Sequence, residues 1–129
     1  MTEINFKREI NAPLDQAIER TTKALSAEGF GILTRIDMHT KIKDKTGKDI
    51  IPTVILGACN TNLAYEAYTA NSDVASLLPC NAVIREIAPG RVSVEFVKPT
   101  AMMAILGDAK LVNLAREADA KIERALSNA

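Results

Sequence analysis

The chain has 129 residues, of which 47% are hydrophobic, so it has the size of one ordinary domain and can bury a core without disulfides or metal ions. Sixteen basic residues balance sixteen acidic ones, which argues against nucleic acid or an anionic membrane surface as a partner. No window approaches the ~18 apolar residues of a membrane span, and the N-terminus does not resemble a signal peptide, so we expect a cytoplasmic protein.

The chain begins with a predicted strand, a helix and a second strand. Residues 2–10 alternate between apolar and polar side chains, which is the period of a half-buried strand. Pro13 suits the first position of a helix, and the apolar stripe that follows it ends before Gly29. This stripe consists of Leu14, Ala17, Ile18, Thr21 and Leu25. Residues 30–38 alternate again and predict the second strand.

A charged segment and an apolar strand follow. Residues 39–49 are too charged for the core, and we expect a short exposed helix that ends near Gly47. Pro52 precedes the sequence TVILGAC, an almost unbroken apolar run that predicts the central strand of the sheet. Asn62 is then expected to cap a helix over residues 63–70.

The last third of the chain predicts a hairpin and a long helix. Residues 81–88 and 91–97 alternate on either side of a Pro-Gly turn, which is typical of an antiparallel hairpin. After Pro99 a short apolar helix is expected, with its methionines as packing residues, and Asp108 can cap a longer C-terminal helix. No linker or repeat interrupts the chain. We therefore expect one α+β domain over residues 1–129, with helices packed on a five-stranded sheet.

The two cysteines occupy the ends of predicted strands. Cys59 ends the third strand just before a helix, where the helix dipole would lower the pKa of a thiol. Cys80 stands where the fourth strand begins. If these strands are antiparallel, both thiols lie at one edge of the sheet and share a pocket, whereas parallel strands would separate them. The alternative is that both cysteines only pack in the core, because free cysteine is among the most buried residue types.

A metal site is a weaker interpretation of the same residues. Asp37 and His39 lie two positions apart on a strand end, so with Cys59 and Cys80 they could form a four-ligand zinc set. His39 could also pair with either thiol as the base of a nucleophilic cysteine. The sequence contains neither C-x-x-C nor H-x-x-x-H, so we expect no metal and no other cofactor.

Several segments resemble a known family. "ILGACN", "LLPCNAVIRE" and "PTAMMAILGDAKLVNLAREADAKIERAL" are similar, in the same order, to segments of the bacterial and archaeal domain of unknown function three hundred and two. The resemblance covers nearly the whole chain. It implies a curved, mainly antiparallel sheet in a β-α-β(4)-α order, similar to TATA-box-binding-protein-like folds, and a homodimer. It does not imply DNA binding.

The residues that match the family motif carry no assigned role. They are Asp37, Gly57, Ala58, Cys59, Asn60, Leu78, Pro79, Cys80 and Asn81. The family's activity is unsettled, so the resemblance does not say whether the protein is an enzyme.

Two hypotheses of function follow. In the first, a two-cysteine site serves thiol redox chemistry, sulfur handling or small-ligand binding. Cys59 is then the nucleophile or first ligand and Cys80 its partner, Asn60 and Asn81 donate hydrogen bonds, and Asp37 and Gly57 are further binding candidates. In the second, the protein is a non-catalytic homodimeric binding module whose cysteines only pack. Exposure of the thiols distinguishes the two, and the sequence does not name the ligand or substrate.

Overall fold

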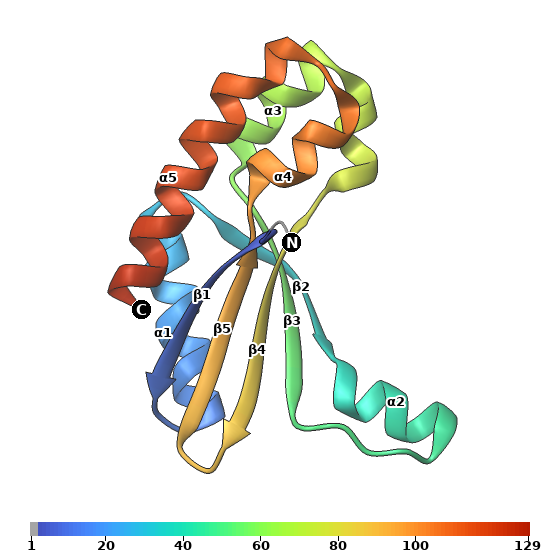
Figure 1. Ribbon diagram of the computed structural model, residues 1–129, viewed down its shortest axis with the longest axis vertical. Coiled ribbons are helices and arrows are strands. Elements are labelled where there is room, and N and C mark those ends of the chain that lie inside the picture. Colours follow the sequence, from blue (N-terminus) through green and yellow to red (C-terminus); the bar gives the residue numbers. More distant parts are fainter. Residues whose placement is uncertain (1–2) are drawn as a thin grey trace.

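An antiparallel sheet in the order β1-β5-β4-β3-β2 forms the centre of the computed structural model, which describes residues 3–129 (Figure 1). All neighbouring strands in it run antiparallel. The strands are β1 (Asn5–Asn11), β2 (Gly31–Asp37), β3 (Thr53–Cys59), β4 (Cys80–Ala88) and β5 (Arg91–Val97). The α+β class and the five-stranded sheet expected from the sequence are therefore confirmed.

The helices cover one face of the sheet and one of its ends. They are α1 (Leu14–Ala27), α2 (Met38–Thr46), α3 (Thr61–Ala70), α4 (Pro99–Met103) and α5 (Val112–Asn128). Figure 1 shows α1 and α5 along one side of the sheet, α3 and α4 together at one end, and α2 projecting from the opposite end. No helix within residues 3–129 is long and apolar enough to span a membrane.

The order of strands and helices along the chain corresponds to the predicted β-α-β(4)-α arrangement. The five strands with α1 and α5 give this order, and α2, α3 and α4 lie in connections between them. The predicted hairpin is present as β4 and β5, and Gly90 in its turn has a φ of 73°, which favours glycine. One prediction is wrong, because β4 and not β3 lies at the middle of the sheet.

The apolar sequence of β3 has a different cause from a central position. Val54, Leu56 and Ala58 alternate toward the helices and are at most 2% exposed. On the other face, Gly57 is buried beneath Thr34 and Pro79. The unbroken apolar run therefore reflects burial of both faces of β3.

The core lies between the sheet and the pair α1 and α5. The strand residues on the helix-facing side alternate strictly and are fully buried: Val54, Leu56, Ala82, Ile84, Val92, Val94 and Phe96. Phe96 meets Phe30 edge to face, with ring centroids 6.1 Å apart. Such aromatic pairs add about 0.5–1.5 kcal/mol to the stabilisation that burial of the two rings provides.

Three arginines fix the C-terminal half of α5. Arg8 of β1 donates hydrogen bonds to the carbonyls of Leu126 and Ser127, and Arg20 of α1 donates to the carbonyl of Ala129 at 3.0 Å. Cations are favourable here because the carbonyls at a helix C-terminus carry partial negative charge. Arg124 also pairs with Glu28 at 2.9 Å. These contacts hold α5 in a fixed place, and its N-terminal half consequently lies over the end of the sheet.

Candidate functional site

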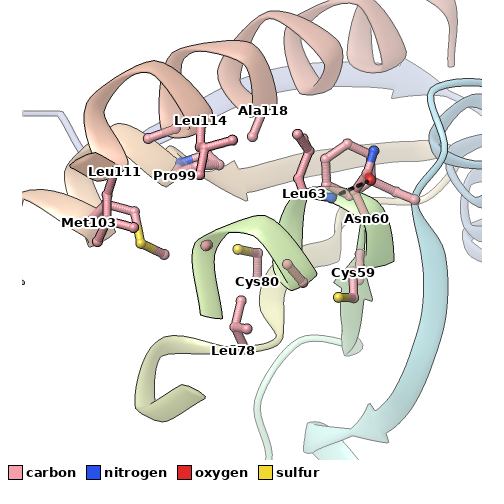
Figure 2. Close-up of a pocket in the computed structure, with 15 residues that line it drawn as sticks. Cys59, Asn60, Leu63, Leu78, Cys80, Pro99, Met103, Leu111, Leu114 and Ala118 are labelled. Atoms are coloured by element: carbon pink, nitrogen blue, oxygen red, sulfur yellow. Dashed lines mark hydrogen bonds between the residues drawn. The ribbon is translucent and has the colours of Figure 1, made fainter. Parts of the chain in front are cut away.

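The two cysteines lie at the same edge of the sheet. Cys59 is the last residue of β3 and Cys80 is the first residue of β4, and the antiparallel register places Cys80 opposite Ala58. Both cysteines line one cavity at the end of the sheet (Figure 2). The cysteines therefore have the placement expected for antiparallel strands. This placement alone does not decide their role.

The cavity is small and almost entirely apolar. It has a volume of about 60 Å³ and lies between the sheet end, α3, the α4 region and α5. Its lining includes Phe30, Leu63, Leu78, Leu111 and Leu114 together with five alanines and Pro99. One water molecule needs a cavity volume of roughly 10–15 Å³, so this cavity has room for only a few non-hydrogen atoms.

The thiols are shielded from water to different degrees. Cys59 is half-buried and Cys80 is 7% exposed, and both are free thiols. Burial raises the pKa of Cys59 above its ordinary value. Burial, followed by the charges of Cys59 and Asp119, raises the pKa of Cys80 to about 11. This direction is opposite to the lowering expected from the helix, and its cause is desolvation of the Cys59 thiol by burial.

Asn60 connects the cavity to the neighbouring turn. Its side-chain oxygen accepts a hydrogen bond from the backbone N–H of Leu63 at 3.2 Å, so Asn60 and not Asn62 caps α3. Its amide nitrogen donates to the carbonyl of Glu28 at 3.3 Å. The side chain predicted to serve a ligand is therefore used to hold α3 against the turn between α1 and β2.

Replacement of Asn60 by alanine is expected to lower the free energy of unfolding by about 1–2 kcal/mol. The variant loses an N-cap, which contributes ~1 kcal/mol, and the hydrogen bond to Glu28. Asn62→Ala is the matched control, since Asn62 is exposed and a change of at most about 0.5 kcal/mol is expected there. Urea denaturation measures both, and equal losses would contradict the assignment of the cap.

Gly57 serves close packing on the face of the sheet opposite the helices. A Cβ atom at this position would lie 2.2 Å from Oγ1 of Thr34 and 2.7 Å from Cγ of Pro79. Pro79, which follows a cis peptide bond, thus lies directly on the backbone of β3. The glycine and the proline of the two cysteine segments together place the start of β4, and with it Cys80.

The other candidate residues lie away from the cavity. Asn81 is exposed and pairs with Gly57, so it lies on the face opposite the helices. Asp37 pairs with Val54, and its carboxylate accepts a hydrogen bond from Arg35 at 3.0 Å. Gly31 is the β2 residue opposite Cys59, so six residues, or roughly 20 Å of strand, separate Asp37 from the cysteines.

This separation removes the zinc set considered from the sequence. Nδ1 of His39 accepts a hydrogen bond from the backbone N–H of Thr53 at 3.0 Å, at the far end of β3 from Cys59. Neither a Cys-His pair nor a Cys, Cys, His, Asp site is assembled. Within residues 3–129, no three His, Cys, Asp or Glu side chains are grouped to hold a metal ion.

Met103 is a cavity residue that the sequence did not indicate. It lies at the end of α4 and lines the cavity together with Leu111 and Leu114 of the following segments. The apolar sequence after Pro99 predicts a helix, but two adjacent methionines give no sign of which one faces inward. Only the packing of α4 against α5 decides this.

Comparison with known proteins identifies a family and a similar structure. The family model "Domain of unknown function DUF302" matches residues 6–129. A solved structure, described as an uncharacterized conserved DUF302 protein from Bacillus stearothermophilus, is similar with a TM-score of 0.90 and 26% sequence identity. The match covers 98% of each chain. No curated protein matches the sequence significantly.

Proposed function

Because the chain belongs to the DUF302 family, whose function is unknown, the site itself has to indicate the activity, and we propose that the protein binds a small ligand in the cavity beside Cys59 and Cys80. One observation carries this proposal: Cys59 and Cys80, on adjacent strands, both belong to the lining of a single cavity that is almost entirely apolar. Small-molecule sites typically combine an apolar lining with a few placed functional groups.

Binding is better supported than nucleophilic or redox catalysis. The thiolate is the reactive form of cysteine, and the raised pKa values keep both sulfur atoms protonated near pH 7. No histidine, lysine or arginine lines the cavity. Thiol redox chemistry and sulfur transfer both require attack by a thiolate. The favoured role of the neutral thiols is therefore contact with a bound ligand.

Xenon, a small polarisable probe, tests whether the cavity accepts a ligand. We expect the methyl NMR signals of Leu63 and Leu114 to shift as xenon is added to the native protein. Ala64→Leu, which adds volume inside the cavity, should abolish the shifts. Ala120→Leu on the exposed side of α5 is the control and should leave them unchanged. An absence of shifts in the native protein would favour cysteines that only pack.

We also propose that the protein is a homodimer. Four large apolar side chains are exposed on β2 or in the segment between α2 and β3: Leu33, Ile36, Ile50 and Ile51. Their burial against a second copy would remove this apolar surface from water. Sedimentation should show a dimer at micromolar concentration, and a monomer alone would refute the proposal. Both cysteines are free, and unpaired cysteines are typical of reducing compartments, which supports a cytoplasmic location.

A further inference from the structure

A second, larger pocket adjoins the cavity beside the cysteines. It has a volume of about 260 Å³ and is lined by residues of α4, the N-terminal part of α5 and the segment between these helices. Three residues, Met103, Leu111 and Ala115, line both this outer pocket and the inner cavity beside the cysteines. These three side chains therefore form the wall between the two spaces.

Met103 is the wall residue that can move. Ala115 has no rotatable side chain, and Leu111 is 1% exposed and packs in a buried cluster with Ala67 and Val74. Met103 is only partly buried and packs at the edge of this cluster. Its unbranched side chain has three rotatable bonds and extends toward Cys80 in Figure 2. Rotation of Met103 alone would join the outer pocket to the inner cavity.

The size of the inner cavity favours a ligand that occupies both spaces. The inner cavity has room for only a few non-hydrogen atoms, and the binding free energy that each such atom can contribute has an upper limit. A ligand confined there would bind weakly. The outer pocket is also lined mainly by apolar side chains and alanines. A molecule whose apolar tail passes the wall would bury its whole length in these two spaces.

The polar side chains of the outer pocket present hydrogen-bond acceptors. The hydroxyl of Thr100 donates to Asp119 at 2.6 Å, so only its lone pairs are left for a ligand. The backbone N–H of Lys110 donates to Asp108 at 2.9 Å and lowers the pKa of this carboxyl group, which is therefore ionised at pH 7. Among the described residues, no lysine, arginine or histidine lines this pocket. Its chemistry favours a hydrogen-bond donor and disfavours an anion.

We propose that the outer pocket and the inner cavity form one site for an elongated apolar molecule with a hydroxyl head. The tail passes Met103 into the inner cavity, and the head lies beside Thr100 and Asp108. The ammonium group of Lys110, 3.8 Å from the Asp108 carboxylate, already balances its charge, so an uncharged donor is favoured over a cation. This inference rests on the proposed ligand-binding cavity and names the class of ligand.

Titration of the full chain with 1-octanol, followed by methyl NMR, tests the joined site. Val112 lines only the outer pocket and Leu63 only the inner cavity. We expect the methyl signals of both residues to shift with one common dissociation constant. The methyl signal of Met103 should shift with them, whereas that of Met102, which lines neither space, should not. From 1-butanol to 1-octanol the affinity should rise about fourfold for each added CH₂ group.

Octanoate tests the head of the ligand. It has the same chain length as 1-octanol but carries a carboxylate, which the ionised Asp108 repels. We expect octanoate to bind at least ~10-fold more weakly than 1-octanol. Asp108→Asn keeps an oxygen that can accept the hydrogen bond from Lys110 but removes the charge, so it should reduce this difference. Equal affinities of the native chain for both compounds would refute the assigned head group.

Ala109→Trp fills the outer pocket from an exposed position, so the chain should still fold. It should abolish binding of 1-octanol but leave the xenon shifts of Leu63 unchanged, because Ala109 does not line the inner cavity. Ala120→Trp is the matched control. Ala120 is exposed on α5 and lines neither space, so this variant should bind 1-octanol as the native chain does.

Two results would overturn the joined site. Shifts of Val112 without shifts of Leu63 would confine the alcohol to the outer pocket, and equal 1-octanol binding by native chain and Ala109→Trp would place it elsewhere. The inference can also fail separately from the proposed function. Xenon shifts without binding of 1-octanol would refute the joined site alone, whereas the absence of xenon shifts would refute the inner cavity as a ligand site.

Discussion

Gly57→Ala is expected to lower the free energy of unfolding by about 3 kcal/mol, near the upper end of the usual cost of overpacking. The added methyl group would lie 2.7 Å from Cγ of Pro79 and 2.2 Å from Oγ1 of Thr34. The threonine can change rotamer, but the proline ring is fixed by its own backbone. Relief of the clash would therefore have to move the start of β4 away from β3.

Gly31→Ala provides a matched control for this prediction. It makes the same chemical change in the neighbouring strand, where no heavy atom lies within 4 Å of the added Cβ. We expect a change of at most about 0.5 kcal/mol there. Thr34→Ala combined with Gly57→Ala should recover part of the loss but not all of it. Equal urea midpoints for the two single glycine variants would contradict the packing described for Pro79.

Native Cys80 is expected to react with iodoacetamide at least ~100-fold more slowly than the same thiol in the unfolded chain. Its pKa is about 11 instead of 9.0, and this difference of two pH units lowers the thiolate fraction ~100-fold at pH 8. Cys59 is more exposed and should react first. Mass spectrometry of alkylated peptides measures both rates. Equal rates for Cys80 in the native and unfolded chain would refute its burial.

The same pKa shift predicts a loss of stability in alkaline solution. Below pH 9 the thiol of Cys80 is protonated in both the folded and unfolded states. Between pH 9 and about 11 the unfolded chain loses this proton first, so the free energy of unfolding falls by about 2–3 kcal/mol in total. Cys80→Ala should lack this part of the decline. Urea denaturation of both proteins from pH 8 to 11 measures the difference.

Periodicity alone predicted most of the secondary structure. The hairpin of β4 and β5 follows from alternation around a Pro-Gly turn, and the stripe of α5 follows from helical spacing. These features are local, so the sequence contains them directly. The cap of α3 was misplaced by two residues, because Asn60 and Asn62 are equally good caps. Which asparagine caps α3 depends on the residue at which β3 ends, and tertiary packing determines that residue.

The candidate site was predictable only in part. Antiparallel strand order brings Cys59 and Cys80 to one edge, which the family resemblance implied but the residue pattern alone left open. The distance of Asp37 from the cysteines depends on the register of β2 against β3, which local patterns do not encode. The direction of the pKa shift of Cys59 was also missed. It is set by burial, and part of the apolar cover comes from α5, which is distant in sequence from β3.

The pairing of β1 with β5 has a consequence for synthesis of the chain. Asn11 pairs with Arg91, so β1 must wait for at least 80 further residues before its partner exists. At ~5–20 residues per second this delay is roughly 4–16 s. During this time the apolar side of β1, including Phe6 and Ile10, has no strand beside it. The nascent chain is therefore most exposed to aggregation and to chaperones over its first strand, long after that strand has left the ribosome.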